Sequence, residues 1–168
     1  MVRRSCFETV GLFDRNLGSY VEDWDMWLRI ATCYPFKVVK EPLVYYRQIS
    51  NSASRNWEGM ARSFGLVIEK AFTTAPLESQ HLKKRSYSSA NLCLAWKALQ
   101  SRAKDWKTAV RFREKALFYY PSSFFSKEFM RLSFAIFLMR WFGSREYEKF
   151  LKTFHAIRRH ISNILSSS

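Results

Sequence analysis

The sequence predicts a mainly α-helical protein that begins with a short α/β part. From residue 57 onward apolar residues recur at helical spacing. Before that point two short runs rich in β-branched and aromatic residues, 36–39 and 43–47, predict two strands. The chain has 168 residues, enough for one or two small domains. Thr73 to Pro76 interrupts the helical pattern, so we expect two domains, residues 1–75 and 76–168.

The elements of the first part have clear local signals. A short helix is expected at residues 7–11, with Gly11 as its C-terminal stop. A second helix should run from Glu22 to about Cys33 and end at Tyr34-Pro35, because the residue before a proline disfavours helix. Its apolar residues at helical spacing predict one buried face, made of Trp24, Trp27, Leu28 and Ala31.

From residue 57 onward the chain is expected to be helical. A helix at about 57–72 ends the first part, and the second part is expected to be a bundle of helices at about 78–101, 106–120, 123–142 and 145–165. Residues 105–121 resemble the second helix of a tetratricopeptide unit, with small residues at Ala109 and Ala116 and a closing Pro121. Ordinary packing of alanine-rich helices would give the same pattern, so a tetratricopeptide-like hairpin and a plain bundle both stay open.

Three carboxylates cluster where the second helix begins. Glu22, Asp23 and Asp25 fall in its first turn, where the helix dipole favours negative charge. Asp25 and Arg29 have the i,i+4 spacing of an ion pair. For an arbitrary sequence this would be only the acidic start of a core helix.

The segments around this helix point to a specific family. The chain has Val2-Arg3-Arg4-Ser5, then Gly11-Leu12-Phe13-Asp14, then Glu22-Asp23-Trp24-Asp25, and then Leu43-Val44-Tyr45-Tyr46-Arg47-Gln48. In this order and spacing, residues 1–72 resemble the C-terminal, acceptor-side half of family-2 glycosyltransferases, which are inverting enzymes with a GT-A fold. The predicted strands would then be a remnant of that domain.

The resemblance implies roles for four residues. Asp23 falls on the family's general base, which removes the proton of the acceptor hydroxyl. Glu22 would be its neighbouring like charge or a contact to an acceptor hydroxyl, and Trp24 a wall for a sugar ring or simply part of the core. Arg47 would lie near phosphate or form a strand-end salt bridge. Ile49 stands where some members have a histidine, and isoleucine cannot ligate or donate.

The resemblance also implies a divalent metal, Mn or Mg, for the complete enzyme. Its Asp-Xaa-Asp ligands belong to the nucleotide-binding half that precedes this region in the family, and we expect them to be absent from this chain. The sequence therefore predicts an incomplete catalytic domain, inactive alone. The three histidines, His81, His155 and His160, lack ligand spacing and predict no metal site.

Charge is concentrated in the second part. Residues 81–168 hold 18 Lys and Arg against 5 Asp and Glu, out of a net charge of +14 for the whole chain. Such a basic region attracts phosphate-bearing surfaces, and we expect an anionic membrane surface rather than nucleic acid, because the aromatic residues fall on apolar helix faces. Three scattered cysteines and no signal peptide predict a cytoplasmic protein, peripheral to the inner face of the membrane.

The predicted function is transfer of a sugar from a nucleotide sugar to a saccharide, lipid or protein acceptor. The alternative is a non-catalytic helical interaction module that retains the remnant of an enzyme. Nucleic-acid binding is a weaker third hypothesis, which rests on charge alone.

Overall fold

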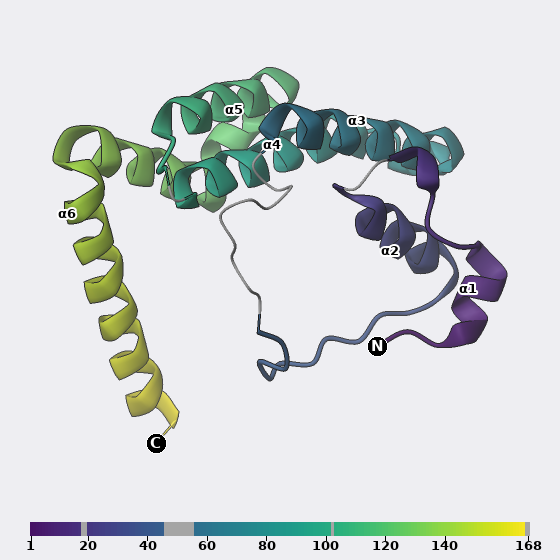
Figure 1. The fold of residues 1–168 in the computed structure, drawn as a ribbon, viewed down its shortest axis with the longest axis horizontal. Coiled ribbons are helices and arrows are strands. Elements are labelled where there is room, and N and C mark those ends of the chain that lie inside the picture. The colour runs from purple at the N-terminus through teal and green to yellow at the C-terminus, as the bar shows by residue number, and fades with distance from the viewer. Residues whose placement is uncertain (18–19, 46–55, 102, 167–168) are drawn as a thin grey trace.

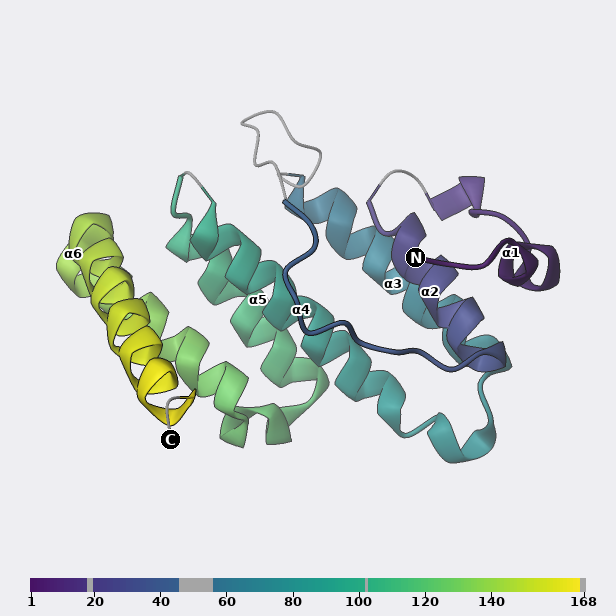
Figure 2. The same ribbon diagram turned by 90° about the horizontal axis from the view of Figure 1, so that it is seen from below.

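The computed structural model describes residues 1–17, 20–45, 56–101 and 103–166, with side chains described through residue 150 and at residue 153. It is mainly helical, as predicted. Figure 2 shows α3, α4 and α5 side by side, with α1 and α2 at one end of the row and α6 at the other. In chain order the elements are α1 (Arg4–Val10), η1 (Arg15–Leu17), α2 (Glu22–Cys33), α3 (Trp57–Thr74), η3 (Leu77–Ser79), α4 (Leu82–Gln100), α5 (Trp106–Tyr119), η4 (Pro121–Phe125) and α6 (Lys127–Ser166), where η marks a 3-10 helix.

The prediction of two strands is wrong. Residues 36–45 carry no strand, and no other described residue does so either. A strand needs a second strand to share its backbone hydrogen bonds, and each of these two runs had only the other as a possible partner. A lone two-stranded hairpin is marginal in water, and Pro42 between the runs cannot donate. Figure 1 shows this segment running clear of the helices, and Val38, Val44 and Tyr45 are largely exposed.

The predicted ends of the first two helices are confirmed. Gly11 takes a positive φ of 81° after α1, and its N–H donates to the carbonyl of Phe7 at 2.9 Å. A side chain there would be strained, which explains the glycine. Helix α2 spans the predicted residues, and the N–H of Tyr34 closes it on the carbonyl of Ile30 at 2.9 Å.

The predicted buried face of α2 is wrong in part. Trp27 is 37% exposed and Ala31 is exposed. The helix packs on two sides instead. Met26 and Ile30 are buried with Cys6 of α1, whereas Trp24 and Leu28 are half-buried against α3. A helix that lies between two neighbours buries two stripes, and neither matches the single face predicted from periodicity.

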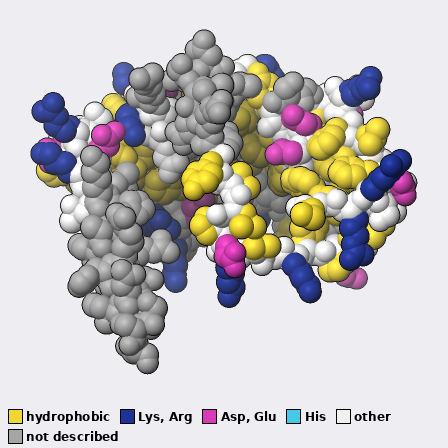
Figure 3. All heavy atoms as spheres, turned by 60° about the horizontal axis from the view of Figure 1, so that its bottom comes forward, with side chains coloured by type: hydrophobic (Ala, Val, Ile, Leu, Met, Phe, Trp, Pro, Cys, Tyr) yellow, Lys and Arg dark blue, Asp and Glu magenta, His cyan; other side chains and the backbone are white. Residues whose placement is uncertain are grey.

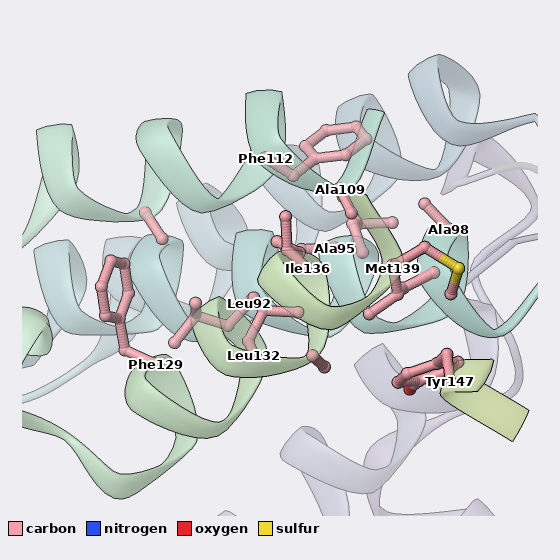
Figure 4. Packing of buried hydrophobic residues seen from close by; sticks show 14 of the residues in the cluster. Leu92, Ala95, Ala98, Ala109, Phe112, Phe129, Leu132, Ile136, Met139 and Tyr147 are labelled. Atoms are coloured by element: carbon pink, nitrogen blue, oxygen red, sulfur yellow. The ribbon is translucent and has the colours of Figure 1, made fainter. Parts of the chain in front are cut away.

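The core lies between α4 and α5, with α3 and α6 packed around them. Small side chains let the two backbones approach, and Ala95, Ala98, Ala109 and Ala116 are completely buried. Figure 4 shows Ile136 and Met139 of α6 among Ala95, Ala98 and Ala109, with Phe112 of α5 in the same cluster. Side-chain caps start α3, α5 and α6, the last through Ser126, whose Oγ accepts from the N–H of Phe129 at 3.2 Å. Asn56 accepts from the N–H of Gly59 at 2.9 Å, and Asp105 accepts from the N–H of Thr108 at 3.0 Å.

The last helix changes direction at Gly143. The predicted break there is confirmed, because Gly143 has a φ of 80° inside α6, and Figure 1 shows the later segment leaving the bundle. The largest buried cluster draws on Met60 of α3 as well as on α4, α5 and α6. The division at residue 75 and the tetratricopeptide-like packing stay predictions. No helix in the described part of the chain has the length and apolar character needed to cross a bilayer.

Candidate functional site

The first turn of α2 divides its carboxylates between solvent and interior. Glu22 is half-buried and Asp23 is exposed. The Oδ1 atom of Asp23 accepts the backbone N–H of Trp24 at 2.7 Å, and no described residue bonds to its Oδ2. No ion pair joins Glu22 or Asp23 to a cation within the described residues. Asp23 is therefore a carboxylate that a ligand can reach.

Asp25 has the opposite environment. It is only 3% exposed. Its Oδ2 accepts from the Nε of Arg29 at 2.9 Å, so the predicted i,i+4 pair is confirmed. Its Oδ1 lies 2.9 Å from the Nζ of Lys70, which comes from α3. The same ammonium donates to Oδ2 of Asp14 at 2.7 Å. We call these four residues, Asp14, Asp25, Arg29 and Lys70, the charge cluster.

The charge cluster fixes α2 to the elements on both sides of it. The guanidinium of Arg29 also donates to the backbone carbonyls of Val10 and of Leu12, the latter at 2.9 Å. Arg29 thereby holds the turn after α1, and Lys70 ties the same helix to α3. Because burial leaves little water to compete, these charged hydrogen bonds keep the start of α2 in one orientation.

Hydrogen bonds shift the pKa values of two members of the cluster. The bond from Lys70 lowers the pKa of Asp14 below its ordinary value of 3.8, and the N–H of Asn16 adds to this effect. For Lys70, burial lowers the pKa, but the bonds to Asp14 and Asp25 outweigh it and raise the pKa above 10.5. Both shifts stabilise the charged forms, the carboxylate of Asp14 and the ammonium of Lys70.

Asp23 and Asp25 do not form a metal site, although one residue separates them as in an Asp-Xaa-Asp motif. Two residues along a helix are about 200° apart around its axis. One carboxylate therefore faces solvent while the other is bonded to two cations. Among the described residues, no group of three or more His, Cys, Asp or Glu side chains lies close enough to bind a metal ion.

A groove lies beside this turn. Its volume is about 490 Å³. Trp24 forms part of one wall, and its ring meets Phe64 of α3 edge to face at a centroid distance of 5.1 Å. The rest of the lining comes from one side of α4: Leu82, Arg85, Ser86, Ser89, Ala90 and Cys93. Trp24 thus lines the groove and also packs on α3, whereas its contact with a sugar ring stays a prediction.

The α4 wall offers a cation and hydroxyl groups. Arg85 is exposed and forms no ion pair with a described residue. Cys93 is half-buried, and this burial raises the pKa of its thiol. A groove with an aromatic wall, two serine hydroxyls and an arginine suits a polar ligand with an apolar face and a negative charge. In the sequence Arg85 is one of the 18 cations of residues 81–168, and nothing in that pattern marks it as a groove residue.

Other predicted residues give mixed results. Arg47 and Ile49 lie outside the described residues, so the role of Arg47 stays a prediction. His81 is exposed, and its Nδ1 lies 2.6 Å from the carbonyl of Glu78, in accord with a surface role. Lys83 pairs with Glu69 at 2.7 Å. The side chains of His155 and His160 are not among those described.

Lys70 is the functional residue that sequence reasoning missed. It occupies an ordinary polar position on α3, and nothing near it in the sequence indicates a partner. Only the packing of α2 on α3 places it between Asp14 and Asp25. A possible signal was the number of acidic residues after Gly11, which exceeds what Arg29 alone can balance.

Comparisons with known proteins support the resemblance. The family model described as "Glycosyltransferase like family 2" matches residues 1–116. The match is longer than the predicted 1–72 and extends through α3 and α4 into α5. No curated protein and no solved structure gives a significant match. Since the family model covers more than two thirds of the chain, the protein belongs to glycosyltransferase-like family 2.

Proposed function

We propose that this protein takes part in the transfer of a sugar from a nucleotide sugar to a saccharide, lipid or protein acceptor, with inversion at the anomeric carbon. The observation that carries the proposal is the difference in environment between Asp23 and Asp25 in the first turn of α2. Asp23 is exposed, it precedes the groove residue Trp24 in the sequence, and no described residue bonds to its Oδ2, whereas Asp25 is buried and bonded to two cations. Of the two aspartates, Asp23 is the one able to act as a base.

The proposed step uses Asp23 as the general base. Its carboxylate accepts the proton of the acceptor hydroxyl while the oxygen attacks the anomeric carbon. The bond from that carbon to the diphosphate breaks on the opposite face, and the leaving nucleoside diphosphate takes the electron pair. The configuration inverts because attack and departure occur on opposite faces. Removing the proton in the transition state contributes roughly 100- to 10,000-fold to such a reaction.

Neighbouring residues would place the acceptor. Glu22 is half-buried next to Asp23 and can accept a hydrogen bond from a second hydroxyl. The indole of Trp24 supplies an apolar wall for a sugar ring in the groove. We keep Arg47 as a proposed contact to phosphate on the strength of the family resemblance. The described residues do not fit the divalent Mn or Mg ion that the resemblance implies, so we propose that groups outside them hold it.

A test of Asp23 needs a complete reaction. We would join the chain to the donor-binding half of a family-2 relative and assay transfer from UDP- and GDP-sugars. We expect Asp23→Asn to lower kcat by about 100-fold or more without a change in the melting temperature. Glu146→Gln is the control, because that carboxylate is half-exposed on α6 and, among the described residues, bonds to Lys149 alone. A folded Asp23→Asn variant with wild-type kcat would rule out the base assignment.

The same assay addresses the alternative function. We propose that the chain without a donor-binding half neither binds nucleotide sugar nor transfers it. If the joined protein folds and still shows no transfer with any donor, a non-catalytic helical interaction module is the better description. Micromolar binding of a nucleotide sugar by the chain alone would contradict the proposed dependence on a separate donor half.

The basic second part of the chain is suited to binding a negatively charged membrane surface. We propose that residues 81–168, with 18 Lys and Arg against 5 Asp and Glu, hold the enzyme at the cytoplasmic face of an anionic membrane. Each Lys or Arg near such a surface contributes about 1 kcal/mol of attraction. A lipid-linked acceptor would then be delivered in the plane to which the protein is bound.

A further inference from the structure

The first segment of α6, from Lys127 to the kink at Gly143, is apolar on two opposite faces. Its inner face is the expected one and packs into the core shown in Figure 4. The inner residues are Phe129, Leu132, Ala135, Ile136 and Met139, all of them buried. A helix on the edge of a bundle normally turns polar residues outward, so its outer face is the unusual one.

The outer face carries a stripe of large apolar side chains. Met130, Phe134, Phe137 and Trp141 follow one another at intervals of four, three and four residues, which places them within an arc of roughly 60° on an α-helix. They are 62%, 51%, 49% and 70% exposed. The rings of Phe137 and Trp141 lie 6.1 Å apart, and the ring of Phe134 meets that of Phe150, beyond the kink, edge to face at 5.8 Å. We call these four residues the outer stripe.

Cations flank the outer stripe on both sides. Arg131 follows Met130 on one side, and Arg140 precedes Trp141 on the other. Both are exposed, as is Lys127 one turn earlier. The guanidinium of Arg140 lies over the ring of Trp106 at 5.7 Å, which holds it beside the stripe. Glu128, the acid of this segment, falls near the opposite side of the helix.

An apolar stripe flanked by cations favours an anionic lipid surface as its partner over a second copy of this chain. A second copy of the chain would bring Arg131 and Arg140 against their own counterparts, in a protein that already carries a net charge of +14. An anionic lipid surface supplies the missing negative charge and an apolar layer beneath it. Aromatic residues flanked by Lys and Arg on an exposed helix face are typical of helices that lie in the membrane interface.

We propose that the outer stripe is the surface by which this protein binds an anionic membrane, with its aromatic side chains in the headgroup boundary and Arg131 and Arg140 on lipid phosphates. The proposal rests on the membrane partner proposed above and names the face that makes the contact. It does not depend on sugar transfer, so vesicle binding can fail or succeed whatever the outcome for Asp23.

The test uses the full chain and vesicles of phosphatidylcholine and phosphatidylserine in a ratio of about 2:1. At low salt we expect Phe137→Ala and Trp141→Ala each to reduce vesicle binding by about tenfold. Arg131→Gln should reduce it by about fivefold. The control is Leu77→Ala, which removes an 89% exposed apolar side chain from η3, between α3 and α4. It should bind as wild type does, and circular dichroism should show all variants folded.

A second readout reports insertion directly. Trp141→Phe keeps an apolar ring, so binding should stay within about twofold of wild type, while quenching of tryptophan fluorescence by brominated lipids should fall. Undiminished quenching in this variant, equal binding to neutral vesicles, or wild-type binding by the two alanine variants would overturn the proposal. A dimer in sedimentation equilibrium that Trp141→Ala converts to monomer would identify the stripe as a self-association surface instead.

Discussion

Replacing Asp25 by asparagine should destabilise the protein through the charge cluster. Asp25 is 3% exposed, and its two oxygens serve two cations, Arg29 and Lys70, each at 2.9 Å. The side-chain amide of asparagine has one oxygen, which accepts, and one NH2 group, which donates. One of the two cations would therefore face a donor and lose its hydrogen bond. The cluster would also change from neutral to a charge of +1 inside the fold. Asp25→Asn therefore removes both a bond and a balance of charge.

The size of the effect follows from the burial of the partners. Breaking a fully buried ion pair costs about 3–5 kcal/mol. The side chains of Lys70 and Arg29 are 39% and 24% exposed, so water recovers part of that loss. We expect a loss of about 2–3 kcal/mol in the free energy of unfolding. For a chain of this length each kcal/mol lowers the melting temperature by about 2–4 °C.

The chain contains a matched control for this measurement. Arg4 and Glu8 are also an arginine and a carboxylate at i,i+4 spacing, but their side chains are 93% and 64% exposed. Glu8→Gln should change stability by less than about 0.5 kcal/mol. Thermal and urea unfolding of both variants, followed by circular dichroism, gives the comparison. Equal, small effects at the two positions would refute the idea that the cluster holds α2 in place.

Two further predictions concern pH and helix capping. The pKa of Asp14 is lowered, so its contribution to stability is present above pH 3.8 and is lost as the pH falls through the lowered value. The pKa of Lys70 is raised, so its contribution is present below pH 10.5 and is lost as the pH rises through the raised value. Urea unfolding should therefore be measured between pH 2 and 5, a range that spans roughly the usual carboxylate pKa. The free energy of unfolding of Asp14→Asn should depend less on pH than that of wild type. An equal pH dependence in the two proteins would contradict the assignment. Asp105→Ala should cost about 1 kcal/mol by removing the cap on the N–H of Thr108, whereas Asp105→Asn keeps an acceptor and should unfold within about 0.5 kcal/mol of wild type.

Helices were predictable from the sequence because their signals are local. The cap at Asp105, the stop at Gly11 and the break at Gly143 act within a turn of the residues they control. The start of α4 was placed too early, because residues 77–79 form a separate 3-10 turn. The strands failed for the opposite reason. A strand depends on a partner that periodicity cannot supply, and the runs at 36–39 and 43–45 have none among the described residues.

The site was predictable only where it depends on one helix. The pair of Asp25 with Arg29 follows from spacing along α2. The contact between Asp25 and Lys70 joins two helices far apart in the sequence and could not be read from either. The same holds for the groove, because its lining combines Trp24 of α2 with Arg85 of α4.

The burial of Asp25 also explains why Asp23 is the better candidate for catalysis. A residue two positions along a helix faces about 200° away, so once Asp25 is fixed inward, Asp23 must face outward. Arg29 and Lys70 fix Asp25, and the turn at Asp14 fixes Lys70 in its place. The outward direction of Asp23 is thus set by the inward position of Asp25, which takes no part in the proposed chemistry. A base must lie within hydrogen-bond reach of the acceptor hydroxyl, and a rotation of α2 by a fraction of a turn would remove it. In the proposed mechanism, the charge cluster therefore positions Asp23 indirectly, because it fixes Asp25 two residues further along the same helix.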